Sequence, residues 1–262
     1  MLLRTDDRGV LAIGQPAHAW VSGQLARNWG NPRFGAVEPR EEVCLAAEQH
    51  DIGMAGWDLE PTLNRDTGLP HSFIEMPLET HLELWSAGPR RLLRQSRYAA
   101  LLTSMHGVRL YELRDLNTLP PAQAAAIREF MHQQRVFQQD LVATLAADSP
   151  TTSEATPEVI ARNSQLVWTW DFLSLALLLD WTPCTAEEVP TAGEQPLDIH
   201  LAADRTSGHV TVDPWPFTKA PLTIRCEGQR LTGRYQAPEQ LHDALASAPW
   251  ETLELELRPA AA

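Results

Sequence analysis

The chain has 262 residues, of which 44% are hydrophobic and 21% are charged, and these proportions exclude a disordered or fibrous protein. Its 34 acidic residues outnumber its 21 basic ones, and the formal net charge of −13 disfavours binding to nucleic acid or to an anionic membrane. The three cysteines are far apart in the sequence, and no apolar stretch approaches the roughly 18 residues that span a bilayer. We therefore expect a cytoplasmic protein whose partner is a small molecule.

The first two thirds of the chain carry apolar residues at helical spacing. A short apolar run at residues 9–13 favours a strand, and helices are predicted over residues 15–29 and about 39–53. Residues 56–80 are rich in proline, glycine and polar side chains, and an irregular segment of this length in a compact domain is usually functional. The helical patterns that follow lie at residues 78–87, 89–106, 120–147 and 157–181, and the last is the most hydrophobic.

The pattern changes after residue 184, where polar and apolar residues begin to alternate. This alternation predicts short strands, and one helix over residues 238–247 interrupts them. The predicted strands have the sequences LDIHLAA, HVTVDPWPF, LTIRCEG, RLTGRYQ and LELELRP. We therefore predict a mainly α fold, in which a helical domain over residues 1–184 carries a small antiparallel β appendage, residues 185–262, at the C-terminus.

Histidine and aspartate residues recur on the predicted helices and at helix ends. A helix bundle brings such positions together in its core, and a set of imidazole and carboxylate ligands suits zinc, iron or manganese. The predicted metal ligands are His18, His50, Asp51, His81, His106 and Asp171.

Asp171 gives the strongest single signal in this set. Its neighbours Trp170 and Phe172 are aromatic, and burying a carboxylate among them is unfavourable unless it is paired with a cation or bound to a metal. The structural alternative is an ion pair with an arginine such as Arg162 or Arg97. Both uses require a buried carboxylate with a positively charged partner.

The other candidates also have structural interpretations. His50 and Asp51 stand at the end of a predicted helix, where a histidine interacts with the helix dipole and an aspartate caps a turn. His18 and His106 can be hydrogen-bonded core histidines, and His81 can lie on an exposed helix face. The whole ordered set, rather than any one residue, favours a metal site.

Three further residues are candidates for roles in catalysis or in substrate binding. Asp58, seven residues after Asp51, is a candidate general base or outer carboxylate of the metal site, or a residue that caps a turn. Arg33 and Arg65 lie in the two long loops and can bind an anionic substrate or remain solvated. No GxSxG, GxxxxGK[ST], GxGxxG or HExxH motif is present, so the chemistries that depend on these motifs are not expected.

The ordered set resembles the HD-domain superfamily of metal-dependent phosphohydrolases. The shared order is a histidine, a His–Asp pair and a distal aspartate, here His18, His50–Asp51 and Asp171, over about residues 15–180. His81 and His106 match the two extra histidine positions of two-metal members. The string HDIGM is similar to the HDIGK of cyclic-dinucleotide phosphodiesterases, with Met54 at the lysine position. The strings GQPAHAW and DPWPF resemble the sequence pattern of a bacterial branch of the superfamily.

This resemblance implies an HD-like helical bundle that hydrolyses a phosphoester with one or two divalent ions of iron, manganese, zinc or nickel. The first ion would be held by His18, His50, Asp51 and Asp171, and a second by His81 and His106 with Asp51 bridging. The catalytic carboxylates would be Asp51 and Asp58, and Arg33 and Arg65 would bind the anionic substrate. Two alternatives remain, a di-iron oxygenase with the same six ligands and a non-catalytic binding or regulatory protein on an HD scaffold.

Overall fold

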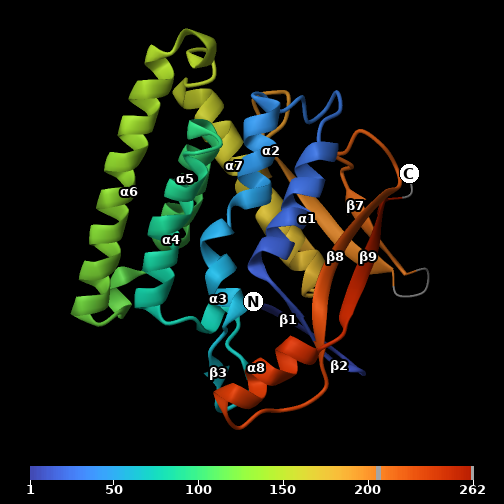
Figure 1. The fold of residues 1–262 in the computed structure, drawn as a ribbon. Coiled ribbons are helices and arrows are strands. Elements are labelled where there is room, and N and C mark those ends of the chain that lie inside the picture. The colour runs from blue at the N-terminus through green and yellow to red at the C-terminus, as the bar shows by residue number, and fades with distance from the viewer. Residues whose placement is uncertain (205–207, 261–262) are drawn as a thin grey trace.

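The computed structural model describes residues 1–204 and 208–260 and shows a large curled sheet against which helices pack (Figure 1). Seven strands form this sheet in the order β1-β2-β8-β9-β7-β6-β5, with β7 and β9 parallel and the other neighbours antiparallel. The strands are β1 (Leu2–Asp6), β2 (Gly9–Ile13), β5 (Cys184–Val189), β6 (Leu197–Asp204), β7 (His209–Asp213), β8 (Leu222–Leu231) and β9 (Trp250–Pro259). A separate two-stranded sheet pairs β3 (Leu63–Asn64) with β4 (Leu69–Pro70).

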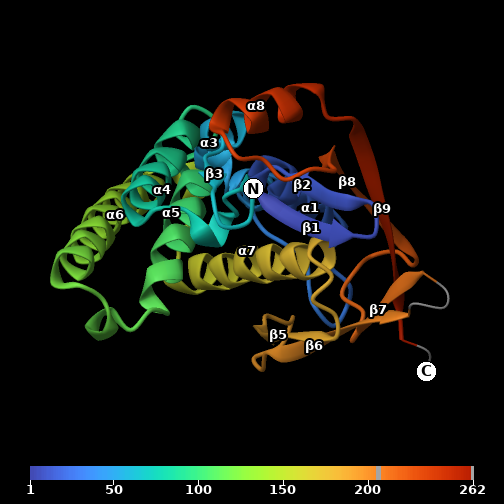
Figure 2. The same cartoon turned by 90° about the horizontal axis from the view of Figure 1, so that it is seen from below.

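Most of the helices lie in layers over the inner face of the large sheet, whereas the C-terminal helix packs against Ala12 and Leu231 in a separate cluster. In the described chain the helices are α1 (Gln15–Asn28), α2 (Arg40–Gln49), α3 (Ala55–Leu59), α4 (Leu78–Leu92), α5 (Arg97–Glu112), α6 (Pro121–Ala147), α7 (Pro157–Leu178) and α8 (Pro238–Ser247), with short 3-10 helices that include η1 (Ile52–Met54) and η2 (Phe73–Glu75). Helix α1 packs on β8 and α7 packs on β5 (Figures 1 and 2). Helices α2 and α5 pack against these two, and α6 is outermost. Within the described ranges, no helix has the length and apolar character needed to cross a membrane.

One continuous core joins the sheet to the inner helices. Trp29, which follows α1 as its C-cap, contacts the ring of Trp170 on α7, with 5.6 Å between the ring centroids. The same cluster of buried side chains contains Ile199 on β6 and Ile224 on β8. Because these residues come from both ends of the chain, the sheet and the helical layer share one hydrophobic interior.

The predicted mainly α fold with a small antiparallel appendage is wrong. The protein has an α/β fold in which about half of the chain is helical and the large sheet is mixed. The error arises at the N-terminal end, where β1 and β2 form a hairpin and β2 pairs with β8, so that Val10 faces Leu231. Pairing between strands so far apart in the sequence leaves no local pattern to recognise. The sheet therefore includes strands from both sides of the predicted domain boundary after residue 184.

The individual elements agree more closely with the prediction. The strand at 9–13 and the helix at 238–247 are confirmed with their predicted limits, and α1, α6 and α7 differ from their predicted ranges by at most three residues at either end. The predicted break before Pro89 is wrong, because α4 continues through this proline and ends at Leu92. Helix α5 instead begins after Ser96, whose hydroxyl accepts a hydrogen bond from the Ala99 amide. RLTGRYQ is not a separate strand, since its first two residues end β8.

Candidate metal centre

Five buried histidine and aspartate side chains meet where α1, α2, α5 and α7 converge. The cluster consists of His18, His50, Asp51, His106 and Asp171, each with at most 8% of its surface exposed. Helix α2 ends at Gln49, and Asp51 leaves the helical conformation before η1 begins. This change of direction allows the adjacent His50 and Asp51 both to face the interior, which two neighbours on a regular helix cannot do.

The donor atoms of four of these residues lie at the separations expected around one metal ion. His18 Nε2 is 3.2 Å from His50 Nε2, 3.1 Å from Asp51 Oδ2 and 3.1 Å from Asp171 Oδ1. His50 Nε2 is 3.2 Å from Asp171 Oδ1 and 3.6 Å from Asp51 Oδ2. Metal–ligand bonds of about 2.1 Å place neighbouring ligands roughly 3.0–3.4 Å apart, so the spacing fits a first coordination shell.

Hydrogen bonds on the far side of each imidazole fix its tautomer. The Nδ1–H of His50 donates to the Ala47 carbonyl oxygen at 2.8 Å. The Nδ1–H of His18 donates at 2.7 Å to the Ser174 hydroxyl, whose own hydrogen is given to the Asp171 carbonyl oxygen at 2.8 Å. Both Nε2 atoms therefore direct a lone pair into the cluster, the arrangement typical of metal-bound histidines.

Two carboxylates and two imidazole lone pairs pointing at one place require a positive charge between them. Burial alone would raise the pKa of Asp171, but hydrogen bonds with His18 and His50 hold it well below its usual range. Burial would lower the pKa of His18, but hydrogen bonds with Asp171 and Asp51 raise it to about 9. The side chains thus compete for protons, and a divalent cation satisfies the same four atoms at once.

His106 lies at the edge of this group. Its Nε2 is 3.5 Å from Asp171 Oδ2, the carboxylate oxygen that does not face the other two histidines. The imidazole packs between Trp85 and Trp168, with ring centroids 5.5 and 5.3 Å away. Burial lowers the pKa of His106 to about 4, and its buried Nδ1 has no hydrogen-bond partner in the described chain. It is therefore a neutral imidazole with one ring nitrogen that no other group uses.

His81 does not join the cluster, contrary to its predicted role as a ligand of a second ion. Its Nε2 accepts a hydrogen bond from Trp85 Nε1–H at 3.0 Å, and its Nδ1–H donates to the Tyr111 hydroxyl. Burial lowers the pKa of His81 to about 4. Since both ring nitrogens are engaged by side chains, His81 has no lone pair free for a metal.

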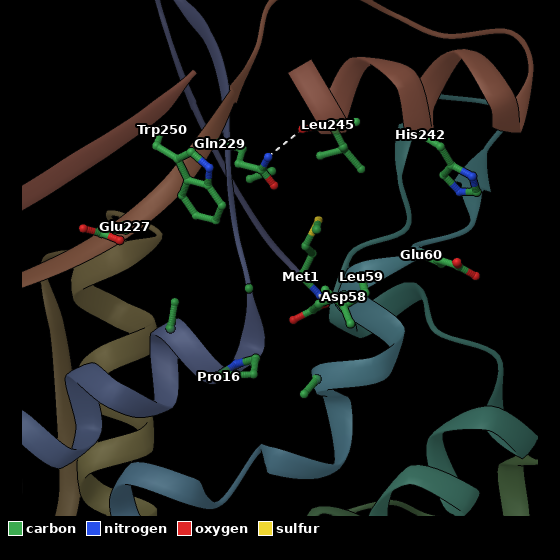
Figure 3. Close-up of a pocket in the computed structure, with 15 residues that line it drawn as sticks. Met1, Pro16, Asp58, Leu59, Glu60, Glu227, Gln229, His242, Leu245 and Trp250 are labelled. Carbon is green, nitrogen blue, oxygen red and sulfur yellow. Dashed lines mark hydrogen bonds and ion pairs between the residues drawn. The ribbon is translucent and has the colours of Figure 1, made fainter. Parts of the chain in front are cut away.

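The predicted general base also lies elsewhere. Asp58 accepts a hydrogen bond from the Gln15 amide at the start of α1, and its Oδ1 is 2.9 Å from the Met1 amino group. It lines a separate cavity of about 690 Å³, where Met1 and Asp58 approach each other beneath α8 and Trp250 (Figure 3). Asp58 therefore fixes the first turn of the helix that carries His18, rather than acting on the cluster itself.

Neither predicted substrate-binding arginine lies at the cluster. Arg33 and Arg65 are exposed loop residues, and neither lines the cavity of about 160 Å³ that borders His18, Asp51 and Asp171. The alternative partners of Asp171 are also occupied elsewhere, because Arg97 pairs with Asp148 and Arg162 donates to a backbone carbonyl. Sequence reasoning missed Ser174, although it lies one helical turn after Asp171 and so shares its face.

No curated protein and no solved structure matches the chain in the comparisons. One family model does match, that of the family described as "Protein of unknown function (DUF3891)", over residues 1–233. The matched region contains every residue of the cluster and extends two residues past the end of β8. The chain therefore belongs to the DUF3891 family.

Proposed function

We propose that the protein is a metal-dependent hydrolase that cleaves a phosphoester, with one divalent transition ion bound by His18, His50, Asp51 and Asp171. The main support is the convergence of four lone-pair donors, in which the two histidine Nε2 atoms lie 3.2 Å apart and each lies 3.1 to 3.6 Å from one oxygen of Asp51 and of Asp171. Two nitrogen and two carboxylate ligands suit zinc, manganese, iron or nickel. The order of these residues along the chain, which resembles that of HD-domain phosphohydrolases, agrees with this assignment.

A divalent ion held by these four residues would lower the pKa of a bound water and neutralise charge on a phosphoryl oxygen. Hydrolysis then joins the water oxygen to phosphorus and breaks the ester P–O bond, and the departing alcohol takes up a proton. His106 is placed to move that proton, because it borders the same cavity and is not one of the four ligands. Ser174 and the Ala47 carbonyl keep His18 and His50 oriented throughout.

The di-iron alternative requires six ligands, one more than the five residues of the cluster. It needs His81 as a ligand, whereas the ring nitrogens of His81 are bound to Trp85 and Tyr111. His106 does form a second group of possible ligands with His50 and Asp171, but both of these residues are already ligands of the proposed first ion. These contacts therefore support one ion rather than a di-iron pair.

Elemental analysis of the purified protein tests this proposal. We expect about one manganese, iron, zinc or nickel ion per chain, lost in His50→Ala and Asp171→Asn but retained in His132→Ala, which alters an exposed histidine on α6. The metal-loaded protein should hydrolyse a chromogenic aryl phosphate, and the two ligand variants should not. Two iron ions per chain would instead favour the oxygenase, and a folded wild-type protein without metal would favour the non-catalytic scaffold.

A further inference from the structure

The small cavity beside the cluster is the part of the site that a substrate would occupy. It has a volume of about 160 Å³ and borders four cluster residues, His18, Asp51, His106 and Asp171. One water takes up about 30 Å³ in the liquid, so the cavity has room for roughly five waters. This volume fits a phosphate group with a few further atoms and is too small to enclose a nucleotide.

Arg114 supplies the cationic charge at the open end of this cavity. Among the residues that line it, Arg114 is the only lysine or arginine, and the two carboxylates are already committed to the histidine pair. Its side chain is exposed and forms no ion pair within residues 1–204 and 208–260. An unpaired guanidinium at the mouth of a cavity is well suited to bind a phosphate through two parallel hydrogen bonds.

A chain of contacts holds Arg114 in this place. Its guanidinium carbon lies 4.9 Å from the centroid of the Tyr111 ring, over which it stacks. The Tyr111 hydroxyl is bound by His81, which in turn accepts a hydrogen bond from Trp85. His81, which the sequence suggested as a ligand, is therefore a positioning residue that orients the aromatic platform of Arg114.

The remaining walls indicate what else the substrate carries. Phe73 and Ile74 of η2 line the cavity, and Ile74 is 78% exposed, so this side offers an apolar surface open to solvent. Gln15 also lines the cavity, and its side-chain oxygen is buried without a hydrogen-bond partner among the described residues. A buried acceptor without a partner is unfavourable and is satisfied when a ligand provides a donor.

We propose that Arg114 binds the phosphate of a small terminal phosphomonoester, whose organic group lies against Phe73 and Ile74 and offers a hydroxyl to Gln15. This assignment rests on the proposed metal-dependent hydrolase, since it uses the same cavity and names its substrate class. The net charge of −13 and the small volume of the cavity disfavour nucleic acids and other large polyanions as substrates.

Binding of inorganic phosphate, the product of such a reaction, tests the role of Arg114. Isothermal titration calorimetry is carried out on metal-loaded wild-type protein, Arg114→Gln, Arg114→Lys and Arg128→Gln. The last variant removes the same charge from an exposed position on α6. We expect Arg114→Gln to weaken phosphate binding at least tenfold, Arg114→Lys to weaken it less, and Arg128→Gln to leave it within twofold, with metal content unchanged in all four proteins.

Equal phosphate affinity in Arg114→Gln and wild type, or no phosphate binding by the metal-loaded wild type, would overturn the assignment to Arg114 and leave the metal site intact. If the wild type holds no metal, the proposed hydrolase fails, and the same titration on the metal-free proteins decides the role of Arg114 alone. A tenfold loss of phosphate affinity in Arg114→Gln would then support Arg114 as a phosphate-binding residue that acts without a metal. An unchanged affinity would overturn its role.

Discussion

His106 and Ser174 each contact proposed metal ligands without being assigned as ligands themselves, and they differ in what they contribute. His106 borders the cavity and presents an imidazole nitrogen toward Asp171. Ser174 lies behind His18, where its hydroxyl accepts the Nδ1–H hydrogen bond. We therefore expect substitution of His106 to change mainly the turnover number and substitution of Ser174 to change mainly the metal affinity.

His106→Ala is expected to keep the metal and to lower the turnover number by roughly 10²–10⁴, the usual contribution of a group that transfers a proton in the transition state. Metal content by elemental analysis and hydrolysis of an aryl phosphate, measured on the same preparation, check this. Loss of the metal together with activity would show that His106 is a fifth ligand instead.

Ser174→Ala is expected to weaken metal affinity by about 10–100-fold, because the His18 ring loses the partner that fixes its tautomer. Competition with a chelator of known affinity measures the change. Ser86→Ala is the matched control, since the Ser86 hydroxyl donates to the Leu82 carbonyl within α4 and touches no cluster residue. Similar affinities for the two variants would rule out a role for Ser174 in orienting His18.

At the scale of elements, the site depends on how closely η1 packs against α4. Gly53 follows Asp51 by two residues, and a Cβ built on it would collide with the Leu84 carbonyl oxygen of α4. Close approach of the two backbones holds the turn that leads both His50 and Asp51 into the interior. The packing does not require glycine at Gly56 on α3, where an added Cβ meets nothing within 4 Å.

Gly53→Ala is therefore expected to lower the free energy of unfolding by about 1–3 kcal/mol through overpacking, and to weaken metal binding by displacing Asp51. Gly56→Ala should be neutral or stabilising by up to about 1 kcal/mol, because alanine favours a helix. Urea unfolding of the metal-free proteins provides the comparison. Equal urea midpoints of unfolding for the two variants would show that η1 can move away from α4 without loss of stability.

The sequence predicted all five residues of the cluster and the main helices that carry them, but not the sheet. Helical periodicity is local, so the helices that carry His18 and Asp171 could be recognised along the chain. The engagement of His81 with Tyr111 joins residues 30 positions apart, and the pairing of Val10 with Leu231 joins the two ends of the fold. Neither depends on a local pattern, so a single sequence gives no physical basis for predicting them.

At the scale of the whole molecule, Arg230 on β8 links the N-terminal hairpin, β1 and β2, to the C-terminal strand β9. It is 6% exposed, and its guanidinium donates hydrogen bonds to Asp6 at the end of β1 and to Glu251 on β9. These bonds fix β1 and β2 to the C-terminal strands. The hydrogen bond from Arg230 lowers the pKa of Glu251, so ionised Glu251 stabilises the folded state.

Arg230→Gln is expected to destabilise the protein at pH 7. The difference in stability between wild type and variant should be much smaller in acid. Because the pKa of Glu251 is depressed in the folded state, its contribution is present above the unfolded value of about 4.3 and is lost as the pH falls through the lower folded value. Thermal unfolding of wild type and variant at pH 7 and near pH 3 tests this. A difference between the two proteins that does not change with pH would exclude an ionic origin.

The pairing of β2 with β8 also sets an order of events during synthesis. The ribosome completes every cluster residue by Asp171, yet β2, from which α1 emerges, gains its neighbour only when Gln229 to Leu231 have been made. Chains fold from the N-terminus as they are synthesised, so a nascent chain holds all the ligands for some time while one side of the hairpin that anchors His18 is unpaired. For the proposed metal site, this order implies that the ion binds tightly only after β8 has been made, when the protein is nearly complete.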